Sequence, residues 1–332
     1  MRGWQAPRYG GPEVLRLCDL PDPHPGSGEV VVGVRAIGLN FADCMARQGV
    51  YPRVPAAPFV PGMEVVGEVV AVGEGVADPR PGARVVAVPI FGGHAEKVRV
   101  PARYTFQLPP TVDWQTGAAL AVTGLTANHA LFTLGRIRVG ERVAITAAAG
   151  GVGTMAIQMA VNAGARVLAV ASTPEKQVLA TDLGAHDAVG YAGYGEALAG
   201  GVDVVMDAVG GRLFRPGWRA LRPDGRYILY GFATAVGARS IHRLRAGLEI
   251  LRMGRLSPLP MVSHCRTLAG FNLSLVPHLA GELRERFASI LALVTVGELK
   301  PVIGAVLPFA ELPKAHALLQ SRRTTGKVVV EL

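Results

Sequence analysis

Cysteine is scarce in this sequence, and its scarcity argues against a stabilising disulfide framework. Cys18, Cys44 and Cys265 lie far apart and are odd in number, which favours a reducing cytoplasm. Long apolar runs are also missing. No stretch of about 18 uncharged apolar residues occurs, so we expect no membrane-spanning helix, and residues 1–7 lack the apolar core of a signal peptide.

Concentrated charge is absent, although the chain is basic overall. The 34 Lys and Arg residues exceed the 25 Asp and Glu residues and give a net charge of +9, but the basic residues do not form blocks. We interpret this charge as arginine usage in place of lysine plus some anion-binding arginines. A nucleic-acid or anionic-membrane partner is the alternative.

The pattern of strands and helices predicts two domains in 332 residues. Early β-branched runs separated by glycine and proline are typical of a small, mostly antiparallel β-domain, at 30–36, 65–72 and 84–88. Later strands alternate with helices, which predicts a doubly wound parallel sheet. These strands are expected at 142–146, 166–171, 202–207 and 226–230, and the helices at 118–134, 151–163 and 174–183.

The chain returns to β character near its end, with a final strand at 327–331. We therefore predict an α/β protein in which a discontinuous β-domain, residues 1–123 and 269–332, surrounds an inserted nucleotide-binding domain, residues 124–268. Residues 239–255 carry Ile241, Leu244, Leu248 and Leu251 at helical spacing among arginines. We favour a surface helix with this stripe in the core, and a lid or a membrane contact is the alternative.

The strongest chemical signal is a glycine-rich turn between a predicted strand and a predicted helix. Ala148, Gly150 and Gly153 stand at the three positions of a dinucleotide-binding fingerprint, and a second strand follows within about 30 residues. Gly150 lets the backbone approach a pyrophosphate, and Gly151 and Val152 begin a helix whose free N–H groups face it. The turn predicts a dinucleotide site.

The end of the second strand predicts NADP(H) in preference to NAD(H). An NAD site usually carries Asp or Glu there, whereas this chain has Ala171, Ser172 and Thr173, followed by Lys176. One charge-assisted hydrogen bond from Lys176 to a 2′-phosphate is worth roughly 1.5–3 kcal/mol, which is a tenfold to hundredfold preference. Ser172 and Tyr191 are further candidates at this end, and a solvated lysine is the alternative role for Lys176.

Several stretches together resemble a known family. They are residues 38–43, 61–64, 147–153, 184–185 with Tyr191, and 326–329. The chain resembles a medium-chain dehydrogenase/reductase of the zeta-crystallin-like quinone oxidoreductase group, and residues 60–64, 205–211 and 270–273 resemble its vesicle-amine-transport-protein branch. The resemblance implies a GroES-like β-domain, a Rossmann domain and a homodimer joined through the Rossmann domains.

The resemblance also implies that no metal is bound. Asn40 and Met63 stand where zinc alcohol dehydrogenases of the superfamily have two ligands, and three cysteines cannot supply a structural zinc lobe. His94 is the remaining possible ligand, and we interpret it as structural. Asn40 either polarises the substrate oxygen as charge develops or caps a turn or orients the cofactor ribose. The resemblance adds further cofactor contacts, namely Thr123, Thr126, Gly231, Phe232, Phe271, Asn272 and Arg322, with Arg323 as the alternative to Arg322.

Without a Lewis acid, reduction of an electron-poor acceptor is easier than alcohol oxidation. We therefore expect a cytoplasmic, NADPH-dependent, zinc-independent oxidoreductase that transfers hydride to a quinone or an α,β-unsaturated carbonyl. One alternative is an enoyl-thioester reductase of polyketide or fatty-acid type. The other is a non-enzymatic RNA- or membrane-binding protein that retains the fold, for which steep salt dependence of binding would be the sign.

Overall fold

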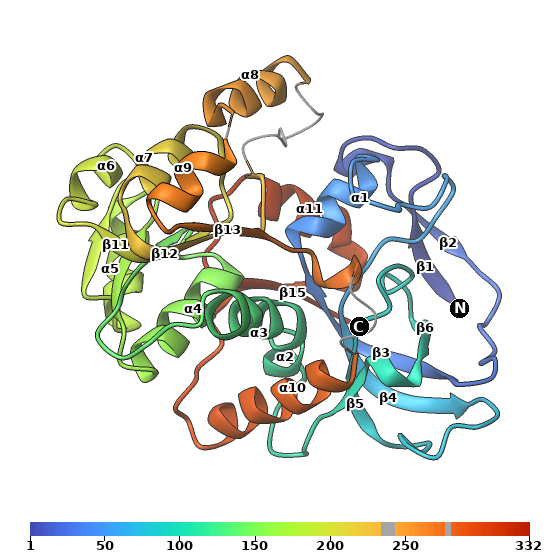
Figure 1. The fold of residues 1–332 in the computed structure, drawn as a ribbon. Coiled ribbons are helices and arrows are strands. Elements are labelled where there is room, and N and C mark those ends of the chain that lie inside the picture. The colour runs from blue at the N-terminus through green and yellow to red at the C-terminus, as the bar shows by residue number, and fades with distance from the viewer. Residues whose placement is uncertain (234–242, 256, 276–279) are drawn as a thin grey trace. The chain divides into compact units, whose positions relative to one another are not determined.

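The computed structural model describes residues 1–233, 243–255, 257–275 and 280–332 (Figure 1). These residues divide into two compact units. The first comprises residues 1–125 and 280–332, and the second comprises residues 126–233, 243–255 and 257–275.

The first unit is built on a seven-stranded sheet. Its strands follow the order β14-β15-β3-β4-β5-β7, with β6 also paired to β3. Only the β14–β15 pair is parallel among these. The bounds are β3 Glu29–Leu39, β4 Val65–Val72, β5 Arg84–Ala87, β6 Lys97–Pro101, β7 Thr105–Gln107, β14 Ile303–Pro308 and β15 Lys327–Glu331; β1 Arg2–Gln5 and β2 Arg16–Asp19 form a separate pair.

Valines dominate the core of the first unit, because β-branched side chains pack well on a pleated surface. Val30, Val32, Val65, Val85 and Val328 are fully buried in one cluster. The helices that accompany the sheet are α1 Phe41–Arg47, α2 Trp114–Gly117, α10 Ala280–Thr295 and α11 Leu312–Gln320, with 3-10 turns at Pro12–Val14, Ala102–Tyr104 and Phe309–Glu311. The return of the chain end to this sheet follows from the pairing of β15 with β3.

The second unit contains six parallel strands in the order β10-β9-β8-β11-β12-β13. The strands are β8 Arg142–Thr146, β9 Arg166–Val170, β10 Asp187–Val189, β11 Val202–Asp207, β12 Leu221–Leu229 and β13 Thr267–Gly270. The helices are α4 Gly151–Asn162, α5 Pro174–Asp182, α6 Tyr194–Ala197, α7 Phe214–Arg219, α8 Arg243–Met253 and α9 Pro258–Ser263, with 3-10 turns at Gly211–Leu213 and Leu273–Leu275. Helix α3, Ala121–Asn128, crosses from the first unit to the second and continues as a π-helix, His129–Leu134.

The predicted fold class, an α/β protein with a GroES-like β-part and a doubly wound parallel sheet, is confirmed. The predicted strand at 142–146 coincides with β8, and α4 and α5 begin at the predicted residues. Strand β13 spans the predicted second domain boundary at 268/269 and pairs with β12, so the parallel sheet continues to Gly270. In the described residues no helix has the length and apolarity needed to cross a bilayer.

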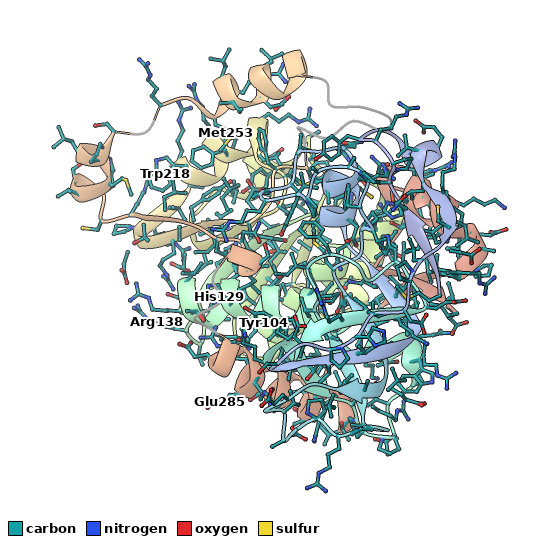
Figure 2. All side chains as sticks on the ribbon, turned by 90° about the vertical axis from the view of Figure 1, so that its right-hand side faces the viewer. Tyr104, His129, Arg138, Trp218, Met253 and Glu285 are labelled. Carbon is teal, nitrogen blue, oxygen red and sulfur yellow. The ribbon has the colours of Figure 1, made fainter. Side chains whose placement is uncertain are left out.

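The preferred interpretation of the basic segment is wrong for the part that the structure describes. Helix α8 forms at 243–253, but Leu248 is 48% exposed and Leu251 is 74% exposed, so their stripe does not lie in the core. The helix is fixed by Glu249, whose carboxylate accepts a hydrogen bond from the Arg212 backbone N–H at 3.1 Å and lies 2.5 Å from Arg252. Trp218 of α7 and Met253 of α8, both labelled in Figure 2, pack on one buried cluster. Residues 239–242 lie outside the described residues.

Candidate functional site

The turn from β8 into α4 combines uncapped helix N–H groups with open space. Gly150 is the N-cap of α4 and has no side chain with which to cap it, so the first N–H groups of the helix, at residues 151–153, have no acceptor within the helix. A Cβ on Gly153 would lie 2.5 Å from the carbonyl oxygens of Ala147 and Ala148, so only glycine fits there. A Cβ on Gly150 would meet only the Ala147 oxygen, at 3.3 Å. The space beside Gly150 is therefore open, and the positive end of the helix dipole lies next to it.

The sharp bend of this turn is made by a residue that the sequence did not indicate. Ala147 adopts a left-handed conformation with φ of 50°, which costs an alanine conformational energy. Ala148, at the first position of the fingerprint, is fully buried, and its N–H donates to the Val170 carbonyl at 3.1 Å. Ala148 thus joins the turn to the end of β9.

The end of β9 carries the residues predicted to select the cofactor. Ser172 is exposed, and Thr173 is the N-cap of α5, where its hydroxyl accepts from the Lys176 N–H at 3.4 Å. Lys176 is half-buried, and burial lowers the pKa of its ammonium. Tyr191 is half-buried and follows β10, the strand that pairs with β9. The four residues therefore follow two neighbouring parallel strands.

Asp207, at the end of β11, organises the adjoining loops. It is fully buried, and its carboxylate accepts from the Thr146 hydroxyl at 2.6 Å, the Tyr227 hydroxyl at 2.6 Å and the Val209 N–H at 2.8 Å. It joins the ends of β8, β11 and β12 and fixes the chain next to the glycine turn. Sequence reasoning missed this residue, and its only signal was a carboxylate at the end of an apolar strand.

The remaining predicted residues of the second unit follow β12 and β13 or lie on α3. Gly231 and Phe232 follow β12, and Thr126 lies on α3. The Phe271 ring lies 4.8 Å from the His129 ring and 6.1 Å from the Tyr230 ring, measured between centroids. The side-chain amide oxygen of Asn272 accepts from the Ser274 hydroxyl at 2.8 Å, which closes a local turn.

Asn40 belongs to the first unit and lies in a buried polar network. It is the N-cap of α1, and its backbone N–H donates to the Asp43 carboxylate at 2.8 Å. Its amide oxygen accepts from the Lys327 ammonium at 2.7 Å, and its amide nitrogen lies 3.2 Å from Glu64. Burial raises the pKa of Asp43 to about 7. Glu64 and Lys327, which are 0% and 3% exposed, pair at 2.5 Å, and sequence reasoning gave neither of them a role.

Two other predicted contacts also belong to the first unit. The Thr123 hydroxyl donates to the Ala119 carbonyl at 2.6 Å, so it is engaged with the turn that precedes α3. Arg322 is exposed after α11 and has a left-handed φ of 58°. Arg323, next to it, is also exposed.

Met63 and His94, which the sequence analysis compared with zinc ligands, are both buried. Met63 is 5% exposed and belongs to the apolar core. His94 is fully buried, packs edge-on against His316 at 5.1 Å, and has no hydrogen-bond partner for either ring nitrogen among the described residues. Burial lowers its pKa to about 3. Within the described ranges, no group of three or more His, Cys, Asp or Glu side chains is arranged to hold a metal ion.

A GroES-like sheet together with a parallel nucleotide-binding sheet defines a two-domain dehydrogenase fold. Residues 26–110 match the alcohol dehydrogenase GroES-like domain, and residues 183–330 match the family described as zinc-binding dehydrogenase. The chain belongs to the medium-chain dehydrogenase/reductase family.

Relatives of two kinds are similar over almost the whole chain. A synaptic vesicle membrane protein VAT-1 homolog of Rattus norvegicus is 35% identical, over 97% of this chain and 82% of its own. A quinone oxidoreductase of Rattus norvegicus is 33% identical, over 100% of this chain and 98% of its own. The solved quinone oxidoreductase of Thermus thermophilus, determined also in complex with NADPH, is 38% identical with a TM-score of 0.82 and full coverage of both chains.

Proposed function

We propose that this protein is an NADPH-dependent oxidoreductase that transfers hydride to a quinone or an α,β-unsaturated carbonyl without a metal ion. The observation that carries the proposal is the turn between β8 and α4, where Gly150 leaves an open space beside uncapped helix N–H groups. A pyrophosphate satisfies those N–H groups and the helix dipole together. The solved relative from Thermus thermophilus, which binds NADPH, supports the same assignment.

The proposed cofactor contacts are the residues predicted from the sequence. Residues 150–153 would hold the pyrophosphate, and Ser172, Thr173, Lys176 and Tyr191 would surround the adenosine phosphate. The remaining proposed contacts are Asn40, Thr123, Thr126, Ala148, Gly231, Phe232, Phe271, Asn272 and Arg322. When bound, NADPH supplies the hydride. The preference for NADPH over NADH follows from Lys176 and from residues 171–173, which carry no carboxylate to repel a 2′-phosphate.

Independence from metal is supported by the charge next to Asn40. The Lys327 ammonium lies 2.7 Å from the Asn40 oxygen, and a cation bound at that oxygen would meet a like charge at close range. The amide nitrogen also has acceptors in the protein, at Gly38 and Glu64. Metal analysis of the purified protein should find less than one zinc ion per chain, and activity should survive a chelator. A stoichiometric zinc ion that is required for turnover would contradict this part of the proposal.

The reaction is tested by following NADPH oxidation with three classes of acceptor. We expect turnover with quinones or enones and much slower turnover with NADH. Turnover confined to enoyl thioesters would favour an acyl-chain reductase. No oxidation with any acceptor, combined with salt-sensitive binding to RNA or anionic vesicles, would favour a non-enzymatic role.

We also propose that the protein forms a homodimer through the second unit. Strand β13 is at the edge of the six-stranded sheet, and an unpaired edge is a template for pairing with another chain. Apolar side chains are exposed on the neighbouring chain segment, namely Leu248, Ile250 and Leu251 on α8 and Leu259 and Val262 on α9. Sedimentation should report a dimer that Leu251→Glu with Leu259→Glu weakens. Val139→Glu, at a side chain 84% exposed elsewhere in this unit, is the control, and a wild-type monomer would contradict the proposal.

A further inference from the structure

The polar network of the first unit fixes the direction in which the Asn40 amide points. Lys327 donates to the amide oxygen at 2.7 Å and lies 2.5 Å from a Glu64 carboxylate oxygen. A reversed amide would set its NH2 group against the ammonium, where two donors repel. Lys327 therefore decides which edge of the amide carries the oxygen.

Both hydrogens of this amide are already used inside the protein. The Asn40 nitrogen donates to the Gly38 carbonyl at 3.0 Å and to the Glu64 carboxylate at 3.2 Å. An amide NH2 group has two hydrogens to donate, whereas an amide oxygen can accept two hydrogen bonds. Asn40 is 8% exposed, so it has a small accessible surface but no spare N–H.

The surrounding chain holds this arrangement in place. A Cβ on Gly38 would lie 1.9 Å from the Ala118 oxygen and 2.9 Å from the Lys327 Cε, so glycine leaves the room in which the lysine side chain lies. The second Glu64 oxygen accepts from the Val122 N–H at 2.9 Å, which anchors the start of α3. The Lys327–Glu64 pair is buried, so solvent screens the attraction between its two charges only weakly.

We infer that Lys327, with Glu64, is a positioning residue that makes Asn40 a hydrogen-bond acceptor. Asn40 then accepts from a hydroxyl group of the bound ligand and does not donate to the oxygen of the substrate being reduced. This inference rests on the proposed function, because two ligands of that reaction carry such a hydroxyl, the cofactor ribose and a hydroquinone product.

Two substitutions of Asn40 separate an acceptor from a donor. Asn40→Asp combined with Glu64→Gln exchanges the amide and the carboxylate, so it keeps the net charge and an oxygen beside Lys327 and removes both N–H groups of residue 40. Asn40→Asp alone is unsuitable, because its second oxygen would face the Glu64 carboxylate, which is also an acceptor. Asn40→Ala removes the oxygen and both N–H groups. In NADPH titrations without an acceptor, Asn40→Ala should bind about 5-fold more weakly than the wild type, as expected for one neutral hydrogen bond, and the exchanged variant should stay within about 3-fold of the wild type. The kcat of the exchanged variant should also stay close to that of the wild type. If an Asn40 N–H instead met the developing charge, the exchanged variant would lower kcat by about 100-fold or more, which would overturn the inference.

The same experiment identifies the ligand that supplies the hydroxyl. If Asn40→Ala weakens NADPH binding, the hydroxyl group belongs to the cofactor. A loss confined to hydroquinone binding assigns it to the product, and either result supports the acceptor role. Unchanged binding of both ligands by Asn40→Ala would contradict it.

The role of Lys327 is tested in a variant that leaves no unpaired buried charge. Lys327→Met with Glu64→Gln should match Asn40→Ala in its loss of ligand affinity, because the amide is then free to rotate, while Tm stays close to that of the wild type. Lys314→Met with Glu311→Gln removes an exposed Lys–Glu pair of the same unit and should change nothing. A Lys327/Glu64 variant that binds ligand as the wild type does would overturn the positioning role.

Failure of the proposed reaction can be distinguished from failure of the inference about Asn40. If the wild type binds NADPH but reduces no acceptor, the proposed reaction is wrong. The NADPH titrations of the Asn40 variants would still test the acceptor role of Asn40. A wild type that binds no NADPH would overturn both proposals.

Discussion

Gly150→Ala tests the anion site at the start of α4 separately from the fold. A Cβ at Gly150 would meet only one backbone oxygen at 3.3 Å, and its φ of −82° and ψ of 172° suit any residue. We therefore expect the free energy of unfolding of the variant to stay within about 1 kcal/mol of the wild type. The added methyl group would occupy the space through which the backbone approaches a pyrophosphate, so NADPH binding should fall.

The expected effect can be worked out for a thermal-shift assay. At an NADPH concentration of 100 Kd, binding stabilises the wild type by about 2.7 kcal/mol. An unfolding entropy of about 2.1 cal/mol/K per residue amounts to about 0.7 kcal/mol/K for 332 residues, so Tm rises by about 4 °C. If the variant binds about 100-fold more weakly, the same concentration stabilises it by about 0.4 kcal/mol, and Tm rises by less than about 1 °C.

Gly153→Ala is the matched comparison, because its Cβ would lie 2.5 Å from two backbone oxygens. The turn must move to admit it, at a cost of about 1–3 kcal/mol, so Tm should fall even without NADPH. We therefore expect Gly150→Ala to be stable but not to bind NADPH, and Gly153→Ala to be destabilised as well. A Gly150→Ala protein that keeps the full shift of about 4 °C would show that the phosphates are held elsewhere.

Three further predictions concern cofactor choice, acid stability and a buried ion pair. Lys176→Ala should raise the KM for NADPH by about tenfold and leave that for NADH unchanged, with Lys314→Ala as the control in steady-state kinetics. Burial lowers the folded pKa of His94 to about 3 and that of His316 well below its usual value. The unfolded chain therefore binds more protons as pH falls below about 6.5, and denaturant titrations should show stability decreasing by up to about 1.4 kcal/mol per pH unit for each histidine. Arg226→Met, which removes a cation 3% exposed and 2.6 Å from Glu141, should lower the free energy of unfolding by about 3 kcal/mol or more in the same titrations.

Elements with local signals could be predicted from the sequence. Helix α5 begins at Pro174 after the Thr173 cap, and Gly164, just beyond α4, has a left-handed φ of 76° that a glycine adopts freely. The predicted helix at 118–134 is instead divided into a turn at 118–120, α3 and a π-helix. The apolar residues continue through these changes in backbone hydrogen bonding, so the sequence pattern does not reveal them.

The orientation of α8 could not be predicted, because a periodic apolar stripe does not say what the helix packs against. The face that anchors this helix is defined by Glu249, 5% exposed, which accepts from the Arg212 N–H. That contact joins residues 37 positions apart in the chain. Leu248 and Leu251 are left exposed as a result.

The proposed site residues, taken unit by unit, also differ in how far the sequence could predict them. The glycine turn could be predicted because its residues are consecutive, although the left-handed Ala147 could not, since alanine has no preference for that conformation. Lys327 and Glu64 are 263 residues apart, and no local pattern connects them.

Sheet register explains why these distant residues meet. Strand β15 pairs with β3 with Val328 opposite Leu39, and β3 pairs with β4 with Ile37 opposite Val65. Lys327 and Glu64 are the neighbours of two of those residues in the chain, and both therefore arrive at the end of β3, where Asn40 caps α1. A slip of one residue in either pairing would turn the charged side chain to the opposite face of the sheet. The ammonium, the carboxylate and the amide are thus assembled by the same antiparallel pairing that builds the core of the first unit, so the geometry of this network depends on the pairing of the whole sheet.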